Sequence, residues 1–211
     1  MSANPAPRRG RFYVLDGVDG CGKTTQAERL VRALGAAGTA PLHVREPGST
    51  RLGERLRELL LDPRSELSTG TEALLFAAAR REMLAQVVAP TLALGRDVLC
   101  ERFHPSTFAY QAVAGGLDEE AMLALLAGWA GDPRPDLVLV LDLPVEEAHR
   151  RACERGASDR IEARGLAFQR RVAEGFRRYA ERVPGTVVVD ASGSAEEVAE
   201  RILEEVRRAH R

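Results

Sequence analysis

The chain has 211 residues, of which 45% are hydrophobic and 29% charged, and this composition suits one α/β domain with a sizeable core. Its net charge of −1 argues against broad binding to nucleic acid or to an anionic membrane surface. The three cysteines show no C-x-x-C spacing and cannot all pair, which favours a reducing, cytoplasmic setting. No apolar run approaches the ~20 residues of a membrane span.

Apolar runs of strand length alternate with amphipathic runs of helix length along most of the chain. Residues 1–11 are basic and proline-rich without an apolar signal core, so we expect a flexible tail before a domain at 12–211. The expected strands are 12–16, 42–45, 97–101, 137–142 and 186–190, and the expected helices are 23–37, 51–61, 70–94, 105–114, 118–130, 144–155, 164–182 and 194–209. This alternation predicts a five-stranded parallel sheet with helices on both faces and ligands at the carboxyl ends of its strands.

Residues 17–24 read GVDGCGKT and match every fixed position of the P-loop pattern G-x-x-x-x-G-K-[ST]. They follow an expected strand and precede an expected helix, as a P-loop requires. The glycines let backbone N–H groups point into one cavity, which the positive end of the helix also faces. Lys23 adds a charge for the β- and γ-phosphates, and Thr24 can place its hydroxyl on Mg²⁺. The chain is therefore predicted to bind a nucleoside triphosphate.

Cys21 lies within this loop, next to the expected N-terminus of the helix. A helix N-terminus favours a thiolate, so oxidative inactivation is a hypothesis, less favoured than an unreactive thiol, that mild peroxide can test.

The segment RACERGASDRIE at 151–162 combines three arginines with a glycine and a serine that loosen the backbone. Such a lid can fold over transferring phosphates, because the planar arginine donors engage phosphate oxygens in pairs. The alternative is a solvated helix end with ordinary charge pairs. The variable P-loop positions Val18, Asp19 and Cys21 carry no base, so positive charge around the γ-phosphate must come from elsewhere, which favours a lid.

No histidine lies in a nucleophile–base pattern, and no G-x-S-x-G sequence occurs. An acceptor that is itself a phosphate has a second pKa of about 6 and needs positioning and charge neutralisation rather than a general base. A kinase acting on a hydroxyl would more often use a carboxylate, and Asp16, Asp19 or Glu101 could serve. This absence favours a nucleotide acceptor and leaves the hydroxyl acceptor open.

Phe76 and Arg80 are four residues apart in an expected helix and so share one face. Phe76 could stack on a base whose carbonyl Arg80 would recognise; the alternative is that Phe76 packs in the core and Arg80 lies at the surface. Tyr110 and Gln111, taken alone, are ordinary half-buried residues. Spacing alone favours the core-packing interpretation.

Seven segments change this balance when they are taken together. They are DGVDGCGKTTQ (16–26), REPGSTRLGERLRELLL (45–61), EALLFAAAR (72–80), ERFHPSTFAYQ (101–111), LVLVLDLPVEEA (137–148), RGASDRIE (155–162) and VVVDASGSAEEVAERI (187–202). In this order they resemble the bacterial thymidylate kinase family, which belongs to the P-loop nucleoside-monophosphate kinases. The resemblance implies ATP-dependent phosphorylation of dTMP to dTDP in dTTP synthesis, with Mg²⁺, by a homodimer whose lid lies at about 151–162.

The resemblance also implies roles for individual residues. The residues at the ATP phosphates would be Gly17, Val18, Asp19, Gly20, Cys21, Gly22, Lys23, Thr24, Thr25 and the lid residue Arg151. The residues at dTMP would be Glu46, Arg57, Phe76, Arg80, Arg102, Thr107, Tyr110 and Gln111, with Tyr110 blocking a ribose 2′-OH. Lys23, Asp19, Arg102 and the lid residues Arg155 and Arg160 would be catalytic, and Thr24, Asp19 and Glu101 would hold the metal.

The chain departs from the family pattern at four places. Glu101 replaces the usual Asp before Arg102, Ser49 replaces a Gly, Arg81-Glu82 replaces two polar residues, and Pro105 replaces a common Asp. These changes put base specificity and rate in doubt. A kinase for another nucleotide or nucleoside, or a nucleotide-binding protein with little turnover, are the rival interpretations, whereas no N-K-x-D motif supports a GTPase.

Overall fold

The computed structural model describes residues 9–38, 40–154, 156 and 160–210. Within these residues the strands are β1 (Phe12–Gly17), β2 (Leu42–Arg45), β3 (Val98–Glu101), β4 (Leu137–Asp142) and β5 (Thr186–Asp190). The α-helices are α1 (Lys23–Ala36), α2 (Arg51–Leu61), α3 (Thr69–Met83), α4 (Ala89–Ala93), α5 (His104–Thr107), α6 (Glu119–Ala127), α7 (Val145–Glu154), α8 (Gly165–Arg182) and α9 (Ala195–Arg208). Two π-helical segments, η1 (Leu84–Val88) and η2 (Phe108–Val113), and a 3₁₀ turn, η3 (Glu162–Arg164), complete the described part of the chain.

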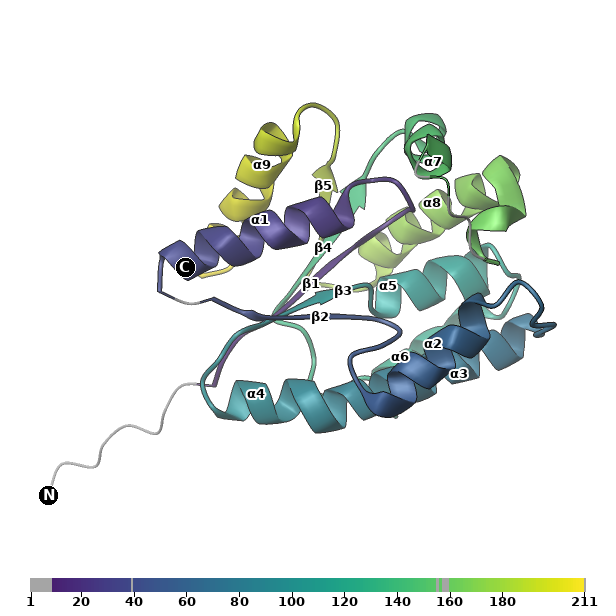
Figure 1. The fold of residues 1–211 in the computed structure, drawn as a ribbon, viewed down its shortest axis with the longest axis horizontal. Coiled ribbons are helices and arrows are strands. Elements are labelled where there is room, and N and C mark those ends of the chain that lie inside the picture. The colour runs from purple at the N-terminus through teal and green to yellow at the C-terminus, as the bar shows by residue number, and fades with distance from the viewer. Residues whose placement is uncertain (1–8, 39, 155, 157–159, 211) are drawn as a thin grey trace, which may run out of the picture.

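The five strands form one parallel sheet in the order β2-β3-β1-β4-β5, so the predicted α/β fold is confirmed. Helices α1 and α9 cover one face, while α5 and α8 pack on the other (Figure 1). The chain runs outward from the central β1 in both directions, first to β2 and β3 and later to β4 and β5. This topology places the segments after β1 and β3 side by side, where a crevice for ligands is expected.

The central strands are buried because helices cover both faces of the sheet. Every residue of β1 and β3 is buried, and the apolar residues of β4 join the same core. Their Val- and Leu-rich sequences are typical of strands in such a position. The core therefore holds the carboxyl ends of β1, β3 and β4 in fixed positions relative to one another.

Two helices that the sequence predicts as continuous are interrupted by π-helical segments. The predicted helix 70–94 is divided into α3, η1 and α4, and Pro90, which has no N–H to donate, lies at the start of α4. The predicted helix 105–114 is divided into α5 and η2. Hydrophobic spacing locates a helix but does not distinguish these registers, and π-segments often lie at functional sites. Here η2 carries Tyr110 and Gln111.

Residues 9–11, which the sequence analysis places in the flexible tail, contact the rest of the fold. Arg11 donates its backbone N–H to Asp97 at 2.7 Å, Gly10 donates to the carbonyl of Leu92 at 2.9 Å, and Arg9 pairs with Asp136. Residues 9–11 are therefore tied to the fold, while the rest of the expected tail lies outside the described residues.

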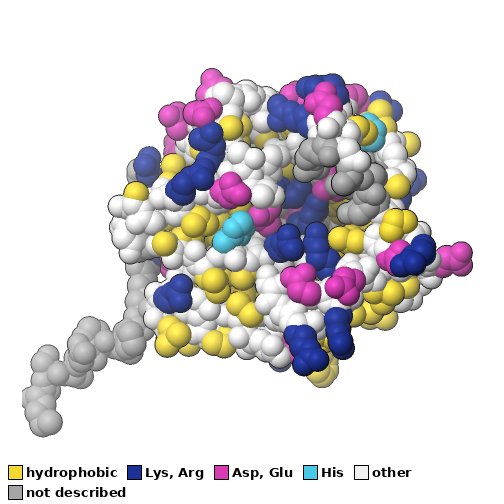
Figure 2. All heavy atoms as spheres, viewed as in Figure 1, with side chains coloured by type: hydrophobic (Ala, Val, Ile, Leu, Met, Phe, Trp, Pro, Cys, Tyr) yellow, Lys and Arg dark blue, Asp and Glu magenta, His cyan; other side chains and the backbone are white. Residues whose placement is uncertain are grey.

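Acidic and basic side chains are interspersed on the face shown in Figure 2, in keeping with the small net charge. Among the described residues, no helix combines the length and the apolar character needed to cross a membrane.

Candidate active site

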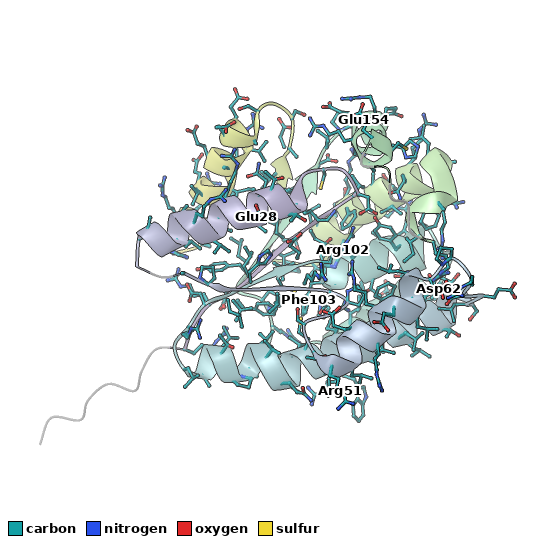
Figure 3. The ribbon with its side chains drawn as sticks, in the orientation of Figure 1. Glu28, Arg51, Asp62, Arg102, Phe103 and Glu154 are labelled. Atoms are coloured by element: carbon teal, nitrogen blue, oxygen red, sulfur yellow. The ribbon has the colours of Figure 1, made fainter. Side chains whose placement is uncertain are left out.

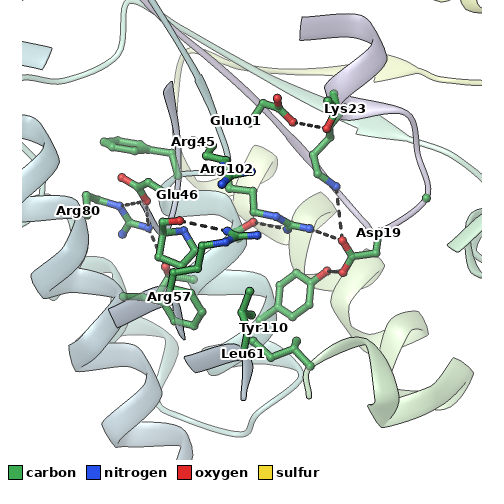
Figure 4. A pocket seen from close by; sticks show the side chains of 18 of the residues that line it. Asp19, Lys23, Arg45, Glu46, Arg57, Leu61, Arg80, Glu101, Arg102 and Tyr110 are labelled. Atoms are coloured by element: carbon green, nitrogen blue, oxygen red, sulfur yellow. Dashed lines mark hydrogen bonds and ion pairs between the residues drawn. The ribbon is translucent and has the colours of Figure 1, made fainter. Parts of the chain in front are cut away.

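A cavity of about 510 Å³ opens where the P-loop follows β1 and Arg102 follows β3 (Figure 4). This volume is in the usual range for small-molecule sites. The cavity is lined by most residues that the sequence analysis selects: Asp19, Gly20, Gly22, Lys23, Thr24, Thr25, Glu46, Arg57, Phe76, Arg80, Glu101, Arg102, Thr107, Tyr110, Gln111 and Arg151. Gly17, Val18, Cys21 and Arg160 are described but lie outside this lining, and Arg155 lies outside the described residues.

The P-loop has the backbone conformation that its glycines allow. Gly22 precedes α1 with φ 96°, and a Cβ added to it would meet no atom within 4 Å, so the space above the loop is open. A Cβ on Gly20 would meet the carbonyl oxygen of Ala148 at 1.9 Å, so only glycine lets the loop pack against α7. Lys23 donates from Nζ to the carbonyls of Gly17 and Val18 at 2.9 and 2.8 Å. These bonds hold the ammonium group at the cavity.

Cys21 does not fit the expectation of a favoured thiolate. Its side chain is buried, and burial raises the pKa of the thiol despite the opposing charges of Lys23 and Arg102. This direction is opposite to the one expected from the helix N-terminus, because desolvation outweighs the nearby cations; oxidative inactivation itself stays a prediction.

Thr24 and Glu101 connect the P-loop to β3. The Thr24 hydroxyl donates to Glu101 Oε2 at 2.8 Å, and His43 Nε2 is 2.8 Å from Glu101 Oε1. Although burial opposes it, hydrogen bonds from His43 and Thr24 lower the pKa of Glu101. A hydroxyl beside an ionised carboxylate offers hard oxygen ligands, which suit Mg²⁺ completed by phosphate oxygens and water. The described residues include no group of three or more His, Cys, Asp or Glu that could hold a metal alone.

Arg102, labelled in Figure 3, lies directly after β3 and lines the cavity. Its φ of 66° is uncommon for a residue other than glycine, which is typical of functional sites. Its guanidinium pairs with Asp19 and donates to Ser106 at 3.1 Å, while the Tyr110 hydroxyl donates to Asp19 at 2.7 Å. Burial and the Asp19 charge raise the pKa of Tyr110 well above its usual value, so the phenol remains a donor.

Arg80 and Glu46 form a buried ion pair at the other end of the cavity, with 2.7 Å between Arg80 Nη2 and Glu46 Oε2. Arg80, only 1% exposed, also donates to Thr107 at 2.9 Å and lies 4.9 Å from the ring centre of Phe103. Burial raises the pKa of Glu46 to about 7, and Arg80 opposes the shift. Within the described structure, Arg80 Nη1 and Glu46 Oε1 are buried without a hydrogen-bond partner. Both residues also line the cavity.

Comparison with known proteins identifies the family. A family model described as thymidylate kinase matches residues 15–202. The thymidylate kinase of Psychrobacter sp. strain PRwf-1 is 43% identical over 203 residues, covering 93% of this chain and 97% of the relative. Those of Pseudomonas fluorescens strain Pf0-1 and Pelotomaculum thermopropionicum are 47% identical over 184 residues and 46% over 187, covering 86% and 87% of this chain and 88% and 87% of the relatives.

The chain belongs to the thymidylate kinase family.

Phe76 and Arg57 both line the cavity, and each also makes a contact that supports the fold. Phe76 is half-buried and packs against the core, as the core-packing interpretation expects, and it also lines the cavity; stacking of Phe76 on a base stays a prediction. Arg80, in contrast, is buried rather than at the surface. Arg57 donates to the carbonyl of Pro47 at 3.1 Å, which ties α2 to the loop after β2. The bond between Glu46 and Pro47 in that loop is cis.

The two described arginines that the sequence analysis places in a lid, Arg151 and Arg160, lie in different surroundings. Arg151 lines the cavity and pairs with Glu147 on α7. Arg160 instead donates to Glu72 at 2.6 Å and to the carbonyl of Leu60 at 3.1 Å. The described geometry therefore supports a place for Arg151 near the phosphates, whereas a catalytic role for Arg160 stays a prediction.

The sequence analysis considers Asp16, Asp19 and Glu101 as possible general bases. Of these three, Asp16 has the most evident structural role. It is fully buried at the end of β1, and its oxygens accept from the backbone N–H groups of Gly17, Phe103 and Ser106 at 2.9–3.0 Å. The Ser106 hydroxyl also donates to it, at 2.7 Å. Asp16 thus fixes the turn that carries Arg102, and its lone pairs are committed. In the sequence, the position of this carboxylate near the end of a buried strand was the feature that could have indicated its structural role.

Sequence reasoning missed Glu72, Arg164 and His43. Glu72 is fully buried and pairs with Arg160 and Arg164, while His43 is bonded to Glu101. Glu72 opens the segment EALLFAAAR but was not singled out, since a lone acidic residue in the first turn of a helix is an ordinary helix-stabilising feature.

The structure shows how the fold accommodates the departures from the family pattern. Ser49 has φ 65° and exchanges side-chain hydrogen bonds with the backbone of Arg45, which hold this turn in place. Glu82 bonds Gln86 on the helix surface, and Pro105 lies at the start of α5, where no N–H is needed. The longer side chain of Glu101 still meets Thr24.

Proposed function

We propose that the chain transfers the γ-phosphoryl group of ATP to the 5′-phosphate of dTMP, giving ADP and dTDP. The observation that carries this proposal is that one cavity is lined both by P-loop residues, Gly20, Lys23 and Thr24 among them, and by the buried Arg80–Glu46 pair. One end of the cavity is suited to phosphates and the other offers fixed donors and acceptors to a base and sugar. Membership of the family supports the same reaction.

The ATP phosphates would lie on the loop from Gly17 to Thr25. The backbone N–H groups and Lys23 would bind oxygens of the β- and γ-phosphates, and Arg151, which lines the cavity, would approach them from α7. Mg²⁺, held by Thr24, Glu101 and Asp19 together with the phosphates, would neutralise charge on the transferred group. The hydrogen bond from Thr24 to Glu101 supports this site, whereas Asp19 is engaged by Arg102 and Tyr110.

Arg102 would bind the acceptor phosphate, because it lies between the P-loop residue Asp19 and the end of β3. Holding the acceptor oxygen in line with the γ-phosphate supplies most of what such a transfer needs. No general base is required for an ionised phosphate acceptor, and the committed hydrogen bonds of Asp16 agree with this. Arg155 and Arg160 are proposed to close over the transferring group from the lid.

The thymine base would lie against Phe76 and under Arg80. The unpartnered Nη1 of Arg80 suits a base carbonyl such as O4, and Thr107 and Gln111 line the same end. Glu46 and Arg57 would face the sugar and its phosphate. Tyr110, packed beside Asp19, would occupy the space that a ribose 2′-OH needs.

We also propose that the chain works as a homodimer. Leu52 and Leu59 on α2 and Leu74 on α3 are exposed on two helices that pack together, and such a surface fits a second copy. Light scattering across protein concentrations tests this. The cytoplasmic setting expected from the cysteines stays a prediction.

The test of function is a coupled assay of ADP release with Mg-ATP and a panel of acceptors: dTMP, dUMP, UMP, CMP, AMP and thymidine. Strong turnover on dTMP is the expected result. Turnover on another acceptor alone would overturn the base assignment, and ATP binding without any turnover would favour a nucleotide-binding protein that has lost catalysis.

A further inference from the structure

Glu72 is a fully buried carboxylate that joins three separate parts of the chain. It lies in the first turn of α3 and accepts hydrogen bonds from Gln111 on η2 at 3.1 Å and from Arg160 at 2.6 Å. Arg164 of η3 pairs with the same carboxylate. These four residues form what we call the Glu72 cluster. The mechanism proposed above gives no role to Glu72 or Arg164.

The cluster constrains which atoms Gln111 can present to the cavity. A carboxylate that faces two guanidinium groups only accepts hydrogen bonds. The Gln111 amide must therefore turn its NH₂ group toward Glu72, as it does in the structure. Its carbonyl oxygen is then the atom left to act on the cavity that Gln111 lines. With a neutral amide at position 72, either orientation of Gln111 would be satisfied.

This orientation matches one class of pyrimidine. Thymine offers a donor at N3–H and an acceptor at O4, which complement an amide oxygen and the donors of Arg80. Cytosine has an acceptor at N3 and an amine at C4, so it meets two mismatches.

We propose that Glu72 is a positioning residue that sets selectivity for thymine over cytosine by orienting Gln111. The proposal rests on the function proposed above.

The same carboxylate holds the carboxyl-terminal arm of the lid. Arg160 and Arg164 flank this arm, residues 160–164, and Arg160 also donates to the carbonyl of Leu60 at the end of α2. Arg164 further lies 4.9 Å from the ring centre of Phe168 on α8. The Glu72 carboxylate thus binds both Gln111 and the lid arm. Its removal should loosen the arm as well as free Gln111.

The experiment compares kcat/KM for dTMP and dCMP in the parent, in Glu72→Gln and in a matched control, Glu119→Gln. Glu119 also accepts from two arginines, Arg178 and Arg182, but away from the cavity. Glu72→Gln should lower the dTMP:dCMP ratio by about tenfold or more, the scale of a site that loses an oriented hydrogen bond. The control should keep the parent ratio. In a Gln111→Ala background, Glu72→Gln should no longer change the ratio.

Hydrogen exchange of residues 160–168 supplies a readout that does not depend on turnover. Protection of this arm should fall in Glu72→Gln and remain at the parent level in Glu119→Gln. If Glu72→Gln alone does not fold, Glu72→Gln combined with Arg164→Met removes one guanidinium together with the carboxylate charge and carries the same selectivity test.

A folded Glu72→Gln variant with the parent ratio overturns the role of Glu72 and leaves the proposed function intact. A parent without turnover on dTMP overturns the proposed function itself, and the exchange measurement then still decides whether Glu72 holds the lid arm. A drop in kcat/KM that is equal for dTMP and dCMP also overturns the selectivity role, because a merely structural residue would produce it.

Discussion

The two ends of the cavity are built in different ways. At the proposed phosphate end, most of the cavity lining comes from one continuous stretch, Asp19 to Thr25, whose backbone and one lysine would provide most of the binding groups for ATP. The base end draws Glu46, Arg80, Thr107 and Gln111 from four separate segments of the chain. Arg80 forms a buried ion pair with Glu46 and a hydrogen bond with Thr107, while Gln111 is bonded to the buried Glu72. At the first end the proposed binding groups come mainly from neighbouring residues in the sequence. At the second end the groups that would recognise the base also hold distant parts of the fold together.

The largest effect should come from breaking the ion pair at the base end. Arg80→Met leaves Glu46 buried without its counter-charge, so we expect a loss of about 3–5 kcal/mol in the free energy of unfolding, measured with urea. Turnover on dTMP should fall as well. The double variant Arg80→Met/Glu46→Leu should recover much of the stability but not the turnover. A single variant as stable as the parent would contradict the coupling of fold and recognition.

Lys23→Ala tests the opposite behaviour at the phosphate end. Losing a preorganised charge at the transferred phosphate should lower kcat on the order of 10²- to 10³-fold in the ADP-release assay. The free energy of unfolding should change much less than in Arg80→Met. Arg32→Ala, an exposed site on the same helix, is the control and should retain activity. If Lys23→Ala and Arg80→Met lost equal amounts of stability, the two ends of the cavity would not differ in how strongly they support the fold.

The pH dependence of stability sharpens the same comparison. Because burial raises the pKa of Glu46 from 4.5 to about 7, the native state keeps the proton more tightly than the unfolded chain does. This contribution to stability is complete below about pH 4.5 and is lost as pH rises through about 7, by about 3 kcal/mol at 1.36 kcal/mol per pKa unit. Urea unfolding at pH 5 and 8 should show this slope in the parent and lose it in Glu46→Gln. Parallel curves would contradict it.

The difference between the two ends also explains what the sequence could predict. The P-loop is a local pattern, so its position between β1 and α1 followed from spacing, as did the five strands. The resemblance to the family supplied Phe76 and Arg80, which spacing alone assigned to core and surface.

The Glu72 cluster and the bond between His43 and Glu101 escaped the sequence analysis for a physical reason. Each joins side chains more than 30 residues apart, and only the packed fold brings them together. The burial of Cys21 was missed for the same reason, since the helix N-terminus is visible in the sequence while desolvation is not.

Tyr110→Phe should have a smaller effect, confined to the sugar. The phenol donates to Asp19 at 2.7 Å, so its removal opens space and leaves an acceptor that a ribose 2′-OH can use. The kcat/KM ratio of dTMP to its ribose counterpart should fall by about tenfold, the scale of one hydrogen bond to a charged group. Tyr179→Phe, at a buried tyrosine on α8, is the control. Equal ratios in Tyr110→Phe and the parent would rule out a role in sugar selection.

The smallest effect should follow mild peroxide, which tests the corrected view of Cys21. Cys21 is 3% exposed and its pKa is raised by burial, so little reactive thiolate is present even at a site beside the phosphates. Activity should persist, and mass spectrometry should find oxidation first at Cys153, which is exposed on α7. Cys153→Ser separates the two thiols. Inactivation of this variant, with sulfenic acid mapped to Cys21, would mean that the loop opens often enough to undo the burial on which the phosphate end depends.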